Sequence, residues 1–122
     1  MKRSFQLIAL FAVVMFTASS FSTINSRLLP TSLRVTVLDA AGNIVEGATV
    51  TLYKTQDDYF EEKEPYRESD KSDGKGRVTF KKVEARKYFI HAKKGDKDNV
   101  GEVVSTAKLK EGRMNMVNTI IK

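Results

Sequence analysis

The sequence predicts an all-β fold, an antiparallel β-sandwich of about seven short strands. Apolar and polar residues alternate with a period of two in several runs, a pattern typical of strands with one buried and one solvated face. Segments rich in Gly, Asp and Asn separate these runs and indicate turns. No stretch carries a convincing helical periodicity, so strands and turns are expected to make up the domain.

The first 20 residues predict a secretory signal peptide. Lys2 and Arg3 give a positive start, residues 5–16 form an apolar run, and residues 17–20, "TASS", are small. The apolar run covers 12 positions, whereas a membrane-spanning helix needs about 20. We therefore expect a signal peptide at 1–20, export to the periplasm or the exterior, and no stable membrane insertion after cleavage.

The remaining chain is expected to form one domain. Residues 21–32 are rich in Ser and Thr and contain Pro30, which predicts an N-terminal tether ahead of a domain at 33–122. The chain has no cysteine, which excludes a disulfide framework and a thiolate metal site. Packing and sheet hydrogen bonds must therefore hold the domain together.

Four strands are clearly patterned. Their predicted inward residues are Leu33, Val35 and Val37; Ala48, Val50 and Leu52; Val78 and Phe80; and Tyr88, Ile90 and Ala92. Weaker patterns predict strands within residues 66–72, 101–107 and 114–121, and turns are expected at 39–43, 72–76, 93–99 and 110–112. This succession favours an immunoglobulin-like or prealbumin-like Greek key.

One segment interrupts the strand pattern. Residues 55–66, "TQDDYFEEKEPY", carry five carboxylates and no alternation. We expect an acidic loop here, with at most a helical turn.

The order of these elements resembles the carboxypeptidase regulatory-like domain, a member of the prealbumin-like group that also includes the B-type repeats of collagen-binding adhesins. The resemblance rests on "VLD" at 37–39, "IVEGATVTLY" at 44–53, "SDGKGRVTF" at 72–80 and "KYFIHAKKG" at 87–95. The residues that match the signature V-x-G-A-x-V of that family are Val45, Gly47, Ala48 and Val50. Departures occur at Ile44, where the family often has proline, and at Arg86, where it usually has glycine.

The resemblance implies a module without catalytic activity, because the zinc site of carboxypeptidases belongs to a separate domain. The residues indicate the same conclusion. His91 is the single histidine and lies at an outward strand position, so we expect a surface histidine rather than a general base or metal ligand. We predict no catalytic residue, no cofactor and no metal site; a small hydrolase would need His91 beside a carboxylate in a cleft.

A binding or structural role at the cell envelope is the predicted function, with an envelope protein or a glycan as partner. Alternatives are a glycan-binding module and an adhesin or pilus-type subunit. Aromatic residues that are not needed for the core could contact the partner, or could simply cover sheet edges and pack beneath the acidic loop. The candidate contacts are Tyr59, Phe60, Tyr66, Phe89 and His91.

Charge is unevenly distributed along the chain. Residues 21–74 hold 6 basic and 10 acidic groups, whereas residues 75–122 hold 13 and 5. This asymmetry is compatible with a basic surface for an anionic partner or with lysines on solvated strand faces. Nucleic acid is not an expected partner, because no recognition motif is present and the chain is expected to be exported.

Substitution of Val50 tests the predicted core. We expect Val50→Asp to unfold the domain, because a fully buried aliphatic side chain contributes about 1.5 to 3 kcal/mol and a buried unpaired charge adds a large penalty. Thermal unfolding followed by circular dichroism measures the effect. An unchanged midpoint would show that position 50 lies outside the core.

Overall fold

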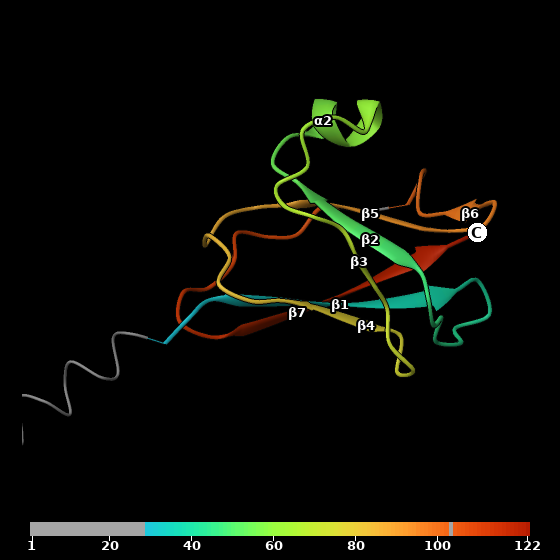
Figure 1. Ribbon diagram of the computed structural model, residues 1–122, viewed down its shortest axis with the longest axis horizontal. Helices are drawn as coiled ribbons and strands as arrows, with labels where there is room; N and C mark the ends of the chain where they lie inside the picture. Colours follow the sequence, from blue (N-terminus) through green and yellow to red (C-terminus); the bar gives the residue numbers. More distant parts are fainter. Residues whose placement is uncertain (1–28, 103) are drawn as a thin grey trace, which may run out of the picture.

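The computed structural model describes residues 29–102 and 104–122, which form two β-sheets packed face to face with a short helix on one of them (Figure 1). The expected signal peptide at 1–20 and residues 21–28 of the expected tether lie outside the described residues. The all-β sandwich predicted from the sequence is confirmed. Within the described residues, no helix is long and apolar enough to cross a membrane.

Over the described residues, the sandwich consists of a three-stranded sheet, sheet A, and a four-stranded sheet, sheet B. Sheet A has the order β4-β1-β7, with β4 at Arg77–Phe80, β1 at Ser32–Asp39 and β7 at Met114–Ile121. Sheet B has the order β3-β2-β5-β6, with β3 at Asp70–Lys71, β2 at Thr49–Tyr53, β5 at Phe89–Lys94 and β6 at Lys97–Asp98. The helix, α2, spans Gln56–Glu61 and covers the outer face of sheet B (Figure 1).

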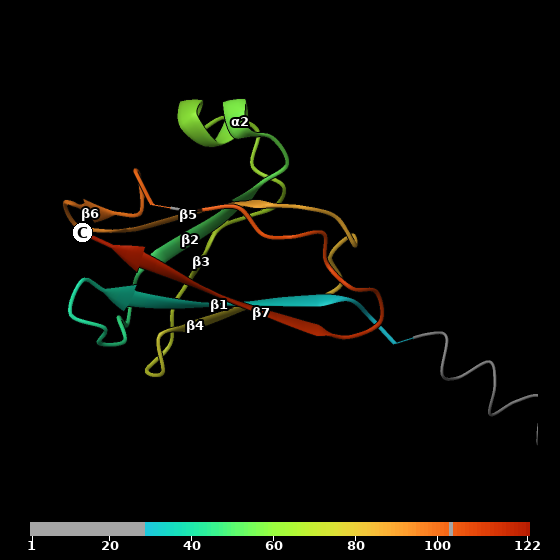
Figure 2. The ribbon, with the colours of Figure 1, turned by 180° about the vertical axis from the view of Figure 1, so that it is seen from behind.

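One strand pair departs from the antiparallel expectation. β7 lies parallel to β1 over its whole length, from Ser32 opposite Met114 to Asp39 opposite Ile121. Figure 2 shows the two arrows side by side and pointing the same way. All other strand pairs in the described residues are antiparallel. The period of two reports which face of a strand is buried but not the direction in which the strand runs.

The strand predicted at 101–107 does not form. In the described part of this segment, Ser105 makes only an isolated bridge to Phe89. The Thr106 hydroxyl accepts the backbone N–H of Tyr88 at 3.0 Å, so a side chain replaces the carbonyl that a continued ladder would use. Pairing occurs instead at β6, inside the turn expected at 93–99.

The predicted core is confirmed. Every inward residue named above for the four clear strands is buried, and Val83, Leu109 and Ile121 join the same cluster. Gly47 adopts a φ of 76°, in the left-handed region that glycine enters at little cost, which explains why glycine precedes the buried Ala48. The signature segment therefore serves packing and chain direction.

An aspartate stabilises the turn after β1, and another stabilises the turn before β4. The carboxylate of Asp39 accepts the N–H groups of Asn43 and Ala41, and that of Asp73 accepts those of Arg77 and Lys75. The backbone hydrogen bond from Asn43 holds the pKa of Asp39 below its ordinary value, and the one from Arg77 does the same for Asp73. Both turns are thus favoured by ionised carboxylates.

A buried amide joins the two sheets. The side chain of Asn99 is fully buried, and its Nδ2 donates to the carbonyl of Ile90 at 2.7 Å and to Oγ1 of Thr119 at 2.9 Å. Its Oδ1 accepts the N–H of Ala92 and the hydroxyl of Tyr59, each at 3.2 Å. Ile90 and Ala92 belong to sheet B, Thr119 belongs to sheet A, and Tyr59 belongs to α2, so one residue links three elements.

Removal of this amide should destabilise the whole domain. We expect Asn99→Ala to lower the free energy of unfolding by about 3 kcal/mol, because it leaves several buried polar groups without partners. Urea unfolding followed by circular dichroism gives the value. The matched control is Asn118→Ala, an exposed position on β7 that should change stability by less than about 0.5 kcal/mol. Equal effects at both positions would contradict the linking role.

Candidate functional site

The acidic segment forms a real, though short, helix. Thr55 caps α2, because its Oγ1 accepts the N–H of Asp58 at 3.1 Å, and Asp57 and Asp58 in the first turn complement the helix dipole. The helix ends at Glu62, which adopts the left-handed region. The loop expected at 55–66 is therefore corrected to a helix followed by an irregular return to β3.

Residues of α2 and of the outer face of sheet B together form an aromatic patch. Tyr59 is 2% exposed, and its ring makes edge contacts with Tyr53, Phe60 and His91 at centroid distances of 6.3, 5.2 and 5.7 Å. Phe89 stands opposite Tyr53 in the β2–β5 register and shares this face. We define the aromatic patch as Tyr53, Tyr59, Phe60, Phe89 and His91.

His91 is buried, which corrects the expectation of a surface histidine. It is 8% exposed, although its strand parity does place it on the outer face of sheet B. The strand period identifies the face correctly, but α2 covers that face. The Nε2 atom lies 3.5 Å from a carboxylate oxygen of Glu62, an ion pair that exists only when the imidazole is protonated.

Tyr59 and Phe60 have opposite roles in the patch. The Tyr59 hydroxyl is bound to Asn99, and burial, reinforced by the charges of Asp98 and Glu62, raises its pKa. Tyr59 therefore stays protonated and anchors the helix to the sheet. Phe60, the next residue, is 61% exposed, so the anchored helix holds an aromatic ring in solvent. The acidic residues in α2 and at its end are Asp57, Asp58, Glu61 and Glu62.

Tyr66 does not join the aromatic patch. Its ring packs against Tyr88 at 5.0 Å beside the core, and its hydroxyl accepts the N–H of Glu84 at 3.1 Å. Burial acts to raise the pKa of Tyr66, but hydrogen bonds from Glu84, Tyr88 and Arg67 outweigh burial and lower it. The structure thus brings together four of the five residues that the sequence suggested as contacts and separates the fifth.

Two residues besides the five candidate contacts complete the site. Tyr53, an aromatic residue that the strand pattern leaves out of the core, forms the floor of the patch, and Glu62, in the acidic segment, approaches His91. The outward parity of Tyr53 follows from the strand pattern, but its position beside Phe89 depends on the cross-strand register, which the pattern does not give.

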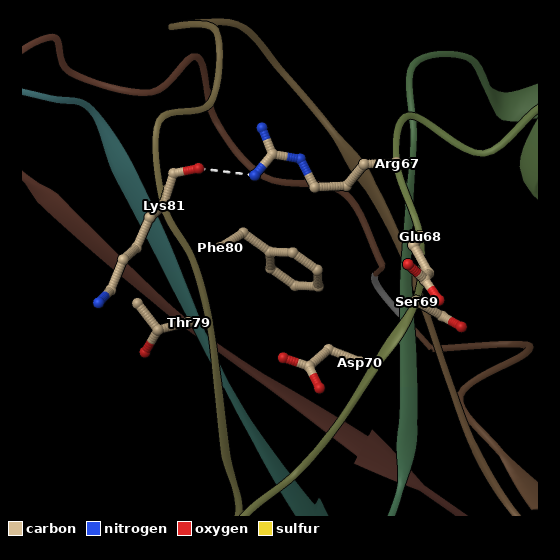
Figure 3. A pocket seen from close by; sticks show the side chains of 7 residues that line it. All are labelled: Arg67, Glu68, Ser69, Asp70, Thr79, Phe80 and Lys81. Carbon is tan, nitrogen blue, oxygen red and sulfur yellow. Dashed lines mark hydrogen bonds between the residues drawn. The ribbon is translucent and has the colours of Figure 1, made fainter.

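A cleft of about 480 Å³ opens between β3 and β4, which are edge strands of sheets B and A. Figure 3 shows the Phe80 ring between Arg67 and Asp70. The Arg67 guanidinium is committed to structure, because it donates to the carbonyls of Lys81 and Lys82 at 2.6 and 2.9 Å. Across residues 29–102 and 104–122, no three His, Asp or Glu side chains gather closely enough to hold a metal ion.

Comparison with known proteins supports the fold alone. No protein-family model matches the sequence, and no curated protein matches it. Among solved structures the chain is similar to the Bacillus anthracis TIE protein, with a TM-score of 0.55 and 19% identity over 77% of this chain. The match spans only 17% of that protein.

A second similar structure is the dioxygenase domain of a dioxygenase and carbohydrate-binding protein fusion from Streptomyces sp. SirexAA-E. Its TM-score is 0.44 and its identity 12%, and the match covers 75% of this chain and 79% of that chain.

The Tyr59 hydroxyl, which anchors α2, can be removed while the aromatic ring is kept. We expect Tyr59→Phe to lower stability by about 1 kcal/mol and to speed amide exchange in α2, because the hydrogen bond to Asn99 is lost. Hydrogen exchange followed by mass spectrometry reports both effects. Tyr53→Phe is the matched control and should leave α2 exchange unchanged. Equal exchange in the two variants would show that Tyr59 does not hold the helix.

Proposed function

We propose that the chain is a small exported, non-catalytic binding module that contacts an envelope protein through α2 and the aromatic patch. The observation that carries this proposal is the pairing of Tyr59, locked beneath the helix, with Phe60, which is 61% exposed on it. Aromatic side chains are enriched at protein interfaces, and this ring is exposed on an element that is already fixed in place.

Fixing the helix before contact lowers the cost of binding. The hydrogen bond from the Tyr59 hydroxyl holds α2 on sheet B, and the cap at Thr55 holds its first turn, so little conformational entropy remains to be lost when Phe60 is covered. An apolar centre with a charged rim is the usual arrangement of a protein interface. The carboxylates of Asp57, Asp58, Glu61 and Glu62 favour a partner with a basic surface.

Export and absence of catalysis belong to this proposal. The positive start, apolar run and small residues at 1–20 support export. The resemblance to carboxypeptidase regulatory-like domains supports an accessory role. A glycan is the alternative partner, since a sugar ring can stack on Phe60; binding on a glycan array that Phe60→Ala abolishes would favour it over a protein.

Site-specific crosslinking tests the contact. A photoreactive benzoylphenylalanine in place of Phe60 should crosslink to an envelope protein in intact cells, and mass spectrometry should identify the same protein in repeated captures. The matched control replaces Ile44, which is 53% exposed in the turn after β1, and should give no such product. Identical products from both positions, or none from position 60, would contradict the proposal.

A further inference from the structure

The outer face of sheet A carries a cationic row beside an apolar row. The cationic row consists of Arg34 on β1 with Lys75, Arg77 and Lys81 on and around β4. The apolar row consists of Met114, Met116 and Ile120 on β7, which are 38%, 72% and 38% exposed. Because β1 lies between β4 and β7, the two rows share one face of the sheet.

Register places the cations in a line. Arg34 stands opposite Thr79, and its Nε donates to the hydroxyl of Thr79 at 3.3 Å. Figure 3 shows Thr79 and Lys81 on the opposite side of β4 from Phe80, which points into the sandwich. Arg34 therefore reaches the level midway between Arg77 and Lys81, and the line extends for about 13 Å at the rise of a β-strand.

Few negative charges line the cleft that runs along Arg34, Lys75 and Arg77. A shallow cleft of about 420 Å³ is lined by Arg34, Lys75, Arg77 and Thr79 with Gly74 and Asp73. Asp73 is its one carboxylate, and that carboxylate accepts the backbone N–H groups of Lys75 and Arg77. Within the part of the chain that the structure describes, none of the four cationic side chains forms an ion pair.

The acidic groups of α2 lie on the far side of the molecule, whereas Glu68 and Asp70 line a separate cleft that ends at Lys81. Figure 1 shows α2 above sheet B and the strands of sheet A as the opposite layer. The helix that carries these carboxylates therefore lies on the opposite side of the molecule from the outer face of sheet A. Such a separation of charge orients a protein toward a negatively charged plane.

We propose that the outer face of sheet A docks on the surface of an anionic phospholipid bilayer. Headgroup phosphates lie against the cationic row, with the shallow cleft taking one of them, and Met116 enters the interfacial region beside Arg34. A hydrated anionic polymer would use the cations but would leave the apolar row in water. The attachment is peripheral and salt-sensitive, because it depends on a few cations and three small apolar contacts.

Vesicle sedimentation tests the charge contribution. The protein, purified in the form in which it accumulates in cells, should bind vesicles of phosphatidylglycerol and phosphatidylcholine more tightly than phosphatidylcholine alone. We expect the triple variant Arg34→Gln, Arg77→Gln, Lys81→Gln to weaken that binding at least about tenfold. The matched control, Lys63→Gln, Lys71→Gln, Lys93→Gln, removes as much charge from the sheet B side and should weaken it less than about twofold.

The apolar row distinguishes a bilayer from a soluble polyanion. Met116→Ser should weaken vesicle binding about threefold and leave retention on a heparin column unchanged. Thermal melts verify that each variant folds; if the triple variant does not, the double variant Arg77→Gln, Lys81→Gln replaces it. Equal loss of vesicle binding in the two charge variants would overturn bilayer docking, and so would equal binding to neutral and anionic vesicles. If the charge variant loses binding but Met116→Ser does not, a soluble anionic polymer is favoured over a bilayer.

Discussion

The arrangement of the domain depends on the side-chain amide of Asn99. All four of its hydrogen-bonding positions are used, two by β5, one by β7 and one by α2. Burying an amide costs free energy unless each of its polar atoms has a hydrogen-bond partner. A different packing of the two sheets would leave some of these atoms unpaired and would therefore be less stable. The backbone groups of Asp98 and Lys122 pair beside it and join the same side of the sandwich.

The proposed contact surface is a consequence of that link. Tyr59 reaches Asn99 only if α2 lies flat on sheet B, and α2 in that position buries His91 and directs Phe60 outward. The outer face of sheet A does not depend on Asn99. Its cations and methionines alternate with the core residues of β4 and β7, so the strands that pack the interior also determine what sheet A presents to its surroundings.

Sequence periodicity predicted the interior of this protein and much less of its surface. Val35, Val50 and Ile90 follow from alternation alone, because a buried face imposes a period of two. His91 could not be placed in the same way, since the period identifies its face but not the helix that covers it. Arg34 and Met116 are neighbours because β1 and β7 pair in parallel in this register. The alternation of apolar and polar residues does not indicate the direction in which a strand runs, so this pairing could not be predicted. Asn99 lies in a predicted turn, where its polar character gave no sign of burial.

The parallel pair also has a mechanical consequence. Ser32 begins β1 at one end of the sandwich, and Ile121 closes β7 at the other. A pull that separates these two ends draws the strands past each other lengthwise, so the evenly spaced hydrogen bonds of the pair are loaded together rather than opened one after another. A domain attached at both ends would therefore bear tension along its longest ladder.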